Sequence, residues 1–155
     1  MLSTLPTCVV ADDHAIVREA VVIRLEEESL ATVVGEAKNG LEAVELIRLQ
    51  RPEIALIDLR MPAATGIEVA QAVVAEQLPT MVIIYSACIG TSMVEAAFAA
   101  GARGYIAKEA STDIMAVAIR SVLAGNEFVN ATRPAVKAPP PVVSGASSKS
   151  SGVVR

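Results

Sequence analysis

The chain has few aromatic residues and few cysteines. Aromatic side chains make up 3% of its 155 residues, whereas apolar residues make up 53%. A domain of this length can bury a substantial core, and here the core must be aliphatic. Cys8 and Cys88 are the two cysteines, and because they lie in or beside different strand-like segments we expect no disulfide between them. Free, mostly buried thiols favour a cytoplasmic protein.

The chain also lacks an excess of basic charge and a long apolar run. Its formal net charge of −4 argues against a general electrostatic attraction to nucleic acid or to anionic membranes. No apolar run reaches the roughly 18 residues of a membrane span. Residues 1–7 do not show the basic and then apolar order of a secretory signal. We therefore expect neither a membrane segment nor secretion.

Strand-like and helix-like segments alternate five times along the chain. Asn39, Thr65, Ser92 and Ser111 are candidate helix N-caps, and a glutamate follows each of the first three at the spacing of a capping box. The predicted strands are residues 8–11, 32–36, 54–57, 81–85 and 105–107, and the helices that follow them end near residues 28, 51, 76, 101 and 125. This alternation, with short connections, predicts a parallel sheet with helices on both faces.

The composition changes abruptly after Arg133. An Ala-Pro-Pro-Pro run at residues 138–141 is followed by residues rich in serine and glycine, without apolar periodicity. Such a segment cannot cover a core. We therefore predict a folded domain in residues 1–130 and a flexible tail, or a truncated linker, in residues 131–155.

Polar residues stand where the predicted apolar strands end. Asp12 and Asp13 follow the first strand, Asp58 the third, Ser86 the fourth and Lys108 the fifth. Because the carboxyl ends of parallel strands converge on one crevice, we expect these side chains to lie together. Three carboxylates beside a hydroxyl and an ammonium group indicate a site for a divalent cation and a phosphoryl group.

Asp58 is the candidate nucleophile of this cluster. A carboxylate can attack phosphorus and form an acyl phosphate. Mg²⁺ would screen the repulsion between the carboxylate and the incoming phosphate and would orient the phosphoryl oxygens. Asp13 and Asp58 are expected to bind the ion directly, and Asp12 directly or through water. The backbone carbonyl of Arg60 is a further expected ligand.

Lys108 and Ser86 are expected to contact the phosphoryl oxygens. The ammonium group of Lys108 would supply a positive charge, and the hydroxyl of Ser86 would donate a hydrogen bond. His14 is the only histidine of the chain. Its place beside the carboxylates, at the start of a helix, favours a spectator over a phosphate carrier.

Four runs resemble the receiver domain of two-component response regulators, and the resemblance covers residues 7–130. They are Val-Ala-Asp-Asp-His at 10–14, Asp-Leu-Arg-Met-Pro at 58–62, Ser-Ala at 86–87 and the run at 101–111. The last run resembles the subfamily that carries a C-terminal LuxR-type helix-turn-helix. The resemblance implies a flavodoxin-like α/β fold of five strand–helix units, with a doubly wound parallel sheet of strand order 2-1-3-4-5.

The resemblance also implies a function. Asp58 would accept phosphate from the phosphohistidine of a sensor histidine kinase, with Mg²⁺ at Asp12, Asp13 and Asp58. Ser86 and Tyr105 would act as switch residues for a signalling face made of the fourth helix, the fifth strand and the fifth helix. Such a module is not an enzyme. It can form a homodimer on phosphorylation and control transcription in a longer parent protein.

The chain departs from the family pattern in three places. Thr65 stands before Gly66 where the family often has an acidic residue. Glu109 follows Lys108 where most receivers have a proline, so we expect no cis peptide bond there. Residues 134–155 contain no helix-turn-helix pattern, so DNA binding is not carried over to this chain.

Two other functions stay open on the sequence alone. A stand-alone receiver could act as an interaction module or a phosphate sink. An aspartyl phosphatase of similar fold would need a general acid two residues after Asp58, and Arg60 stands at that position. Tyr105 is equally open, because a tyrosine at the edge of the core and a moving switch share the same pattern.

Overall fold

The protein forms one parallel sheet in the computed structural model, which describes residues 4–87 and 90–130. The sheet has the strand order β2-β1-β3-β4-β5-β6, and every neighbouring pair is parallel. The elements in chain order are β1 (Thr7–Ala11), α1 (Ala15–Glu27), β2 (Thr32–Ala37), α2 (Gly40–Gln50), β3 (Ile54–Asp58), α3 (Gly66–Ala75), β4 (Met81–Ser86), α4 (Thr91–Ala99), β5 (Gly104–Ala107), α5 (Thr112–Leu123) and β6 (Phe128–Asn130). The predicted doubly wound α/β fold is confirmed.

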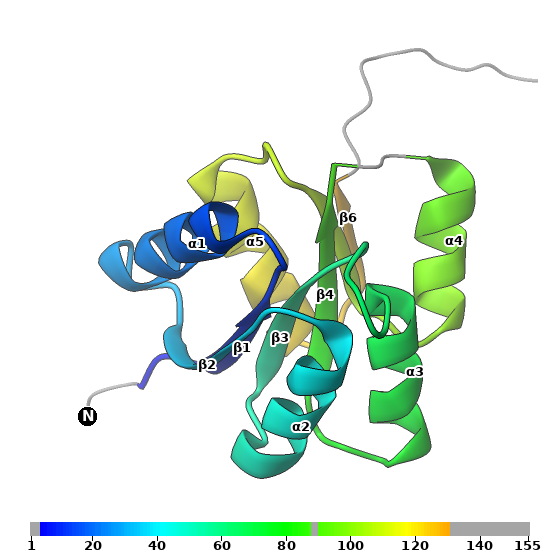
Figure 1. Cartoon of the computed structure of the whole chain (residues 1–155). Coiled ribbons are helices and arrows are strands. Elements are labelled where there is room, and N and C mark those ends of the chain that lie inside the picture. Colours follow the sequence, from blue (N-terminus) through cyan, green and yellow to red (C-terminus); the bar gives the residue numbers. More distant parts are fainter. Residues whose placement is uncertain (1–3, 88–89, 131–155) are drawn as a thin grey trace, which may run out of the picture.

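The helices cover both faces of the sheet, and a separate core fills each side (Figure 1). α1 and α5 pack on one face, and α2, α3 and α4 pack on the other. Neighbouring residues of a strand alternate between the two cores, as Leu56 and Ile57 do in β3. Both cores are mainly aliphatic, as the composition predicts. Tyr85 and Tyr105 are the largest fully buried side chains, one in each core.

Three of the four predicted helix caps are confirmed. Asn39 and Ser111 accept hydrogen bonds from backbone N–H groups of the first helical turn, and Thr65 forms a complete capping box with Glu68. The prediction for Ser92 is wrong, because α4 already begins at Thr91, after Gly90. The carbonyl of Gly90 accepts the first helical hydrogen bonds, and no side chain caps this end.

The sixth strand was not predicted. β6 pairs in parallel with β5 after α5, and Arg103 donates a hydrogen bond to the carbonyl of Gly125 in the connecting turn. With only three residues, β6 is too short to show an alternating pattern. It forms because the edge of β5 offers unpaired backbone groups, which is a tertiary property.

Several expectations concern residues at the margins of the fold. Cys8 is a free, fully buried thiol, and burial raises its pKa to about 12. Cys88 and the predicted tail at 131–155 lie outside the described residues. Among the helices of the described ranges, none has both the length and the apolar character needed to cross a bilayer. All peptide bonds in the described part of the chain are trans, including the bond between Lys108 and Glu109.

Candidate functional site

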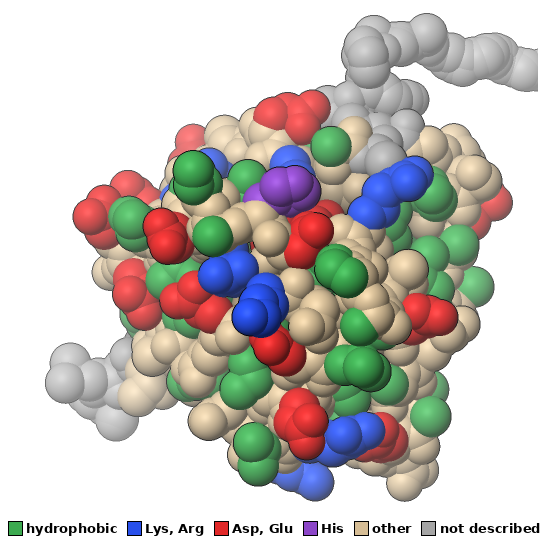
Figure 2. Space-filling view, viewed as in Figure 1, with side chains coloured by type: hydrophobic (Ala, Val, Ile, Leu, Met, Phe, Trp, Pro, Cys, Tyr) green, Lys and Arg blue, Asp and Glu red, His purple; other side chains and the backbone are tan. Residues whose placement is uncertain are grey.

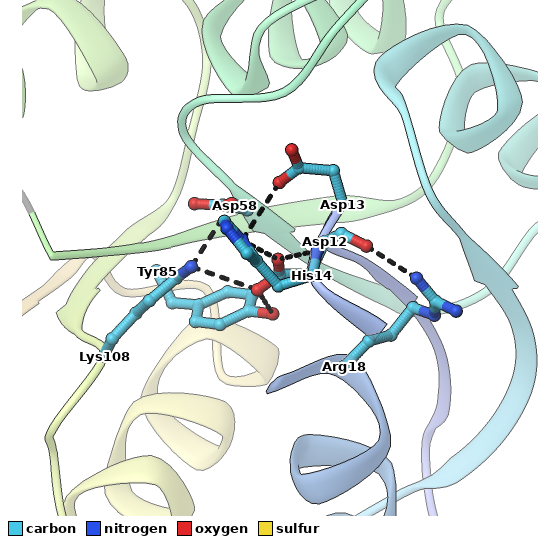
Figure 3. Close-up of polar contacts among 7 residues, drawn as sticks. All are labelled: Asp12, Asp13, His14, Arg18, Asp58, Tyr85 and Lys108. Atoms are coloured by element: carbon cyan, nitrogen blue, oxygen red, sulfur yellow. Dashed lines mark hydrogen bonds and ion pairs between the residues drawn. The ribbon is translucent and has the colours of Figure 1, made fainter. Parts of the chain in front are cut away.

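The site lies at the carboxyl edge of the sheet, where four strands end side by side (Figure 3). Asp12 directly follows β1, Asp58 ends β3, Ser86 ends β4 and Lys108 directly follows β5. Strand register brings these ends together over long chain separations. The backbone N–H of Lys108 donates to the carbonyl of Ser86 at 3.0 Å.

Lys108 joins two buried carboxylates that come from different strands. Its Nζ lies 3.0 Å from Oδ2 of Asp12 and 3.2 Å from Oδ2 of Asp58. Asp12 is fully buried and Asp58 is 4% exposed. Burying such charges is costly unless they are paired, so the ammonium group is a structural requirement of this arrangement as well as a functional group.

Tyr85 belongs to this network, although no pattern in the sequence predicts a role for it. Its hydroxyl donates a hydrogen bond of 2.7 Å to Oδ2 of Asp12, and Nζ of Lys108 lies 5.2 Å from the centre of its ring. Tyr85 pairs in register with Asp58. In the sequence it closes an apolar strand before Ser86, and only the register of β3 and β4 would have placed it beside the acids.

The two buried acids have opposite pKa shifts. Burial raises the pKa of Asp58 above its ordinary value, and the nearby Asp12 charge adds to this, while Lys108 and the backbone of Arg60 oppose it. Burial opposes the ionisation of Asp12 too. There, hydrogen bonds from the His14 backbone, Tyr85 and Lys108 outweigh burial and lower the pKa. Asp12 is therefore the more firmly ionised acid, and Asp58 the more basic one.

Lys108 and Tyr85 both keep their protons at neutral pH. Burial lowers the pKa of Lys108, but the hydrogen bond and charge of Asp12, together with the charge of Asp58, raise it on balance. Burial, followed by the hydrogen bond to Asp12, raises the pKa of the Tyr85 hydroxyl far above its ordinary value. Both groups therefore face Asp12 as donors.

The acids gather closely enough to hold a cation. Ligand atoms of Asp12, Asp13, His14 and Asp58 all lie within 4.8 Å of one another. With the three carboxylates ionised and Lys108 protonated, these four side chains carry a formal charge of −2. Carboxylate oxygens around a negative pocket fit Mg²⁺, which prefers hard oxygen ligands.

His14 stands at the rim of this cluster. Its Nδ1 lies 3.4 Å from Oδ1 of Asp12 and 3.3 Å from Oδ1 of Asp13, and its side chain is 69% exposed. Figure 2 shows the histidine at the surface with acidic side chains beside it. Its backbone N–H, rather than its ring, makes the closer contact with Asp12, at 2.9 Å from Oδ1.

The start of α1 holds Asp12 from the other side. Nη1 of Arg18 donates to the backbone carbonyl of Asp12 at 2.8 Å, and Nε of the same residue pairs with Glu36 of β2 at 3.1 Å. Arg24, one helical turn and a half further on, donates to the carbonyl of Ala110 in the loop after Lys108. Helix α1 thus ties together the two loops that carry Asp12 and Lys108.

The loop after β3 lies against the site because two glycines allow close approach. A Cβ at Gly66 would lie 2.7 Å from the carbonyl oxygen of Asp58, and a Cβ at Gly40 would lie 2.1 Å from the carbonyl oxygen of Ala64. Any other residue would push the loop away. Arg60 is exposed in this loop, and the role of its carbonyl as a metal ligand stays a prediction.

The two remaining predicted side chains, Ser86 and Tyr105, are both buried. Ser86 is buried at the end of β4, and strand alternation points its side chain to the opposite face from Tyr85. Tyr105 is fully buried in the core beneath α4, with Ala97 of that helix in the same cluster. The structure thus brings Asp12, Asp13, Asp58 and Lys108 together. The switch roles of Ser86 and Tyr105 stay predictions.

Comparison with known proteins agrees with this geometry. A family model described as the response regulator receiver domain matches residues 8–120. The probable transcriptional regulatory protein NarL of Mycobacterium tuberculosis is 39% identical over 121 residues, which are 78% of this chain and 56% of the relative. The response regulator GacA of Pseudomonas aeruginosa is 31% identical over 121 residues, with the same two coverages of 78% and 56%. The chain therefore spans just over half the length of these curated relatives.

Solved structures show the same fold. The signal receiver domain of the putative response regulator NarL from Mycobacterium tuberculosis superposes with a TM-score of 0.77 at 37% identity, covering 80% of this chain and 100% of that one. A LuxR-family two-component response regulator from Aurantimonas sp. SI85-9A1 superposes with a TM-score of 0.76 at 31% identity, covering 81% of this chain and 89% of that one. Together with the acidic cluster at the carboxyl edge, these matches show that the chain belongs to the receiver domains of two-component response regulators and is related to the NarL/LuxR-type regulators.

Proposed function

We propose that Asp58 accepts a phosphoryl group from the phosphohistidine of a partner sensor kinase. An oxygen of Asp58 forms the new bond to phosphorus while the P–N bond breaks. The bonding electrons return to the imidazole nitrogen of the kinase, which takes up a proton. One observation carries this proposal: Lys108 forms ion pairs with both Asp12 and Asp58, and these two acids lie close to Asp13.

Each residue of the cluster has a distinct part in this transfer. Asp12, Asp13 and Asp58, with the carbonyl of Arg60, would hold Mg²⁺, and the ion would screen the charge of the phosphate. Lys108 already lies 3.2 Å from an oxygen of Asp58, so its ammonium group is within reach of a phosphoryl oxygen bonded there. Ser86, at the end of the adjacent strand, donates a hydrogen bond to another phosphoryl oxygen.

The electrostatics of the site support Asp58 as the nucleophile. Burial raises its pKa, and a more basic carboxylate is the better nucleophile once it is ionised. Asp12 has the lowered pKa and stays ionised as a metal ligand. Asp58 is thus suited to act as the nucleophile and Asp12 as a metal ligand, although both contact Lys108.

The output of phosphorylation is a change in the face made of α4, β5 and α5. Three features support this part of the proposal: α4 begins without a side-chain cap, Ser86 ends the strand that leads into that helix, and Tyr105 packs in the core with Ala97 of α4. A kinase and a second phosphorylated copy of the receiver are the expected partners. We further propose a cytoplasmic receiver domain at residues 1–130, joined by residues 131–155 to the part of a longer protein that regulates transcription.

The test is the mass of the intact protein after incubation with acetyl phosphate, with and without Mg²⁺. The parent should gain one phosphoryl group only when Mg²⁺ is present, and Asp58→Asn should gain none. Asp113→Asn is the matched control, because Asp113 is the fourth and last aspartate of the chain and lies in the first turn of α5. Phosphorylation of Asp58→Asn would overturn the assignment. Rapid turnover of a phosphomonoester by the parent would point to an aspartyl phosphatase.

A further inference from the structure

Tyr85 contacts both signs of charge in the site (Figure 3). Its hydroxyl donates to Oδ2 of Asp12 at 2.7 Å, and its ring faces Nζ of Lys108 at 5.2 Å. The side chain is 2% exposed, and it packs in the core with residues of α1 and α5. A buried tyrosine hydroxyl needs a partner, and here the partner is a carboxylate of the acidic cluster.

The two oxygens of Asp12 are held by different donors. Oδ1 accepts from the backbone N–H of His14 at 2.9 Å, whereas Oδ2 faces both the Tyr85 hydroxyl and the Lys108 ammonium group. The ammonium group has to move if it transfers its contact to a phosphoryl group. The Tyr85 hydroxyl is carried by a central strand, because β4 pairs with β3 and with β5 at this residue.

We infer that Tyr85 is a positioning residue of the cation site, which holds Asp12 in the orientation that binds the ion and holds Lys108 beside it through its ring. This inference rests on the proposed function, because it requires that the acidic cluster binds Mg²⁺. Partners of this kind orient metal ligands, and their loss typically weakens metal affinity about 10-fold to 100-fold. A strand residue that does not itself bind the ion thereby tunes the metal site.

The variant Tyr85→Phe isolates the hydroxyl. The ring remains and still faces Lys108, so only the hydrogen bond to Asp12 is lost. We expect the dissociation constant for Mg²⁺ to rise about 10-fold. At saturating Mg²⁺ the rate of phosphorylation by acetyl phosphate should return to near the parent value, because the reacting groups are unchanged.

Thr80→Val is the matched control for the loss of a buried hydroxyl. Thr80 lies just before β4, at the opposite end from Tyr85, and its hydroxyl donates 2.6 Å to the carbonyl of Pro52. This variant loses a comparable hydrogen bond far from the acids. It should destabilise the fold while leaving the Mg²⁺ dissociation constant at the parent value.

The experiment is calorimetric titration of each protein with MgCl₂, without a phosphodonor. A weaker affinity in Tyr85→Phe but not in Thr80→Val supports the positioning role. Equal affinities of Tyr85→Phe and the parent overturn it, as does equal weakening in both variants. Because Tyr85 acts through Asp12, the two substitutions should not be additive: in an Asp12→Asn background, Tyr85→Phe should cause no further loss.

A second measurement keeps the inference testable if Tyr85→Phe does not fold. The chain contains two tyrosines, so the parent labelled with 3-fluorotyrosine should give two ¹⁹F resonances, and Tyr105→Phe assigns them. Mg²⁺ should shift the Tyr85 resonance, and an unmoved resonance overturns the inference. If the parent itself binds no Mg²⁺, the proposed function fails and the inference fails with it. If the parent binds and Tyr85→Phe binds equally well, the inference fails alone.

Discussion

The two edges of the sheet are built from different kinds of interaction. At the amino edge, the buried hydroxyl of Thr80 donates to the carbonyl of Pro52, and Thr7 and Glu53 exchange two hydrogen bonds. These bonds pair each donor with one acceptor. At the carboxyl edge, Lys108 divides its charge between two buried carboxylates, and Asp13 adds a third acid nearby.

Unfavourable electrostatic interactions are therefore concentrated at the carboxyl edge of the sheet. Paired groups at the amino edge stabilise the sheet without reacting. At the carboxyl edge, burial and the charge of Asp12 raise the pKa of Asp58, so the ionised form of Asp58 carries a cost that a bound cation would relieve. We therefore expect substitutions at the carboxyl edge to change function as well as stability, and those at the amino edge to change stability alone.

The largest effect is expected for Lys108→Gln. The substitution removes the positive charge 3.2 Å from Asp58, and with it the group that we propose to contact a phosphoryl oxygen. Loss of one such stabilising group typically costs about 100-fold or more in rate. Phosphorylation by acetyl phosphate, followed by intact mass at saturating Mg²⁺, measures the rate. A rate within about threefold of the parent corresponds to a change in barrier height on the order of RT. Such a small change would show that Lys108 serves only to neutralise the acids.

Next in size is the effect of Thr80→Val on stability. The substitution leaves the buried carbonyl of Pro52 without its hydroxyl donor, so the free energy of unfolding should fall by about 1–3 kcal/mol. Urea denaturation measures this change. The phosphorylation rate should stay at the parent value, and a slower rate would show that the two edges are coupled through β4.

Without Mg²⁺, substitutions of the two buried acids should change the free energy of unfolding by a smaller amount, with opposite signs for Asp58 and Asp12. The folded-state pKa of Asp58 is raised, so its ionised form costs stability above that pKa. Asp58→Asn should therefore increase the free energy of unfolding at pH 7, and the gain should shrink as the pH falls through the folded pKa of Asp58.

Asp12 should show the reverse. Its folded-state pKa is lowered, so its ionised form stabilises the fold above the unfolded pKa of about 4. Asp12→Asn should lower the free energy of unfolding at pH 7, and the difference from the parent should shrink as the pH falls below that value. Urea denaturation from pH 7 down to about pH 2, which extends below the unfolded pKa of both acids, tests both predictions. The same sign for both variants would contradict the assigned division between them.

The smallest effect is expected for Thr7→Ala at the amino edge. The hydrogen bond from the Glu53 backbone to the Thr7 hydroxyl is exposed to water, which can replace it. The free energy of unfolding should fall by about 0.5 kcal/mol or less. A loss as large as that of Thr80→Val would mean that burial does not decide the strength of the bonds at this edge.

Local patterns were sufficient for the fold and for most of the acidic cluster. The alternation of apolar runs predicts the parallel sheet, and the caps at Asn39, Thr65 and Ser111 depend only on residues within one helical turn. Asp12, Asp58 and Lys108 were found because each stands at the end of an apolar strand. The prediction of a cap at Ser92 was wrong because glycine is also a favourable N-cap residue, and the helix begins after Gly90 without a side-chain cap.

Long-range contacts could not be read in the same way. The hydrogen bond from Tyr85 to Asp12 spans 73 positions of the chain, and no local sequence pattern around either residue predicts it. Strand β6 forms only because β5 has a free edge. The amino-acid sequence alone specified the aliphatic core, the strand–helix order and the acids at the strand ends, since these follow from periodicity and short-range hydrogen bonds. Strand register and burial decided which carboxylate Tyr85 contacts and which acid is the more basic, because distance and desolvation exist only after the strands have paired.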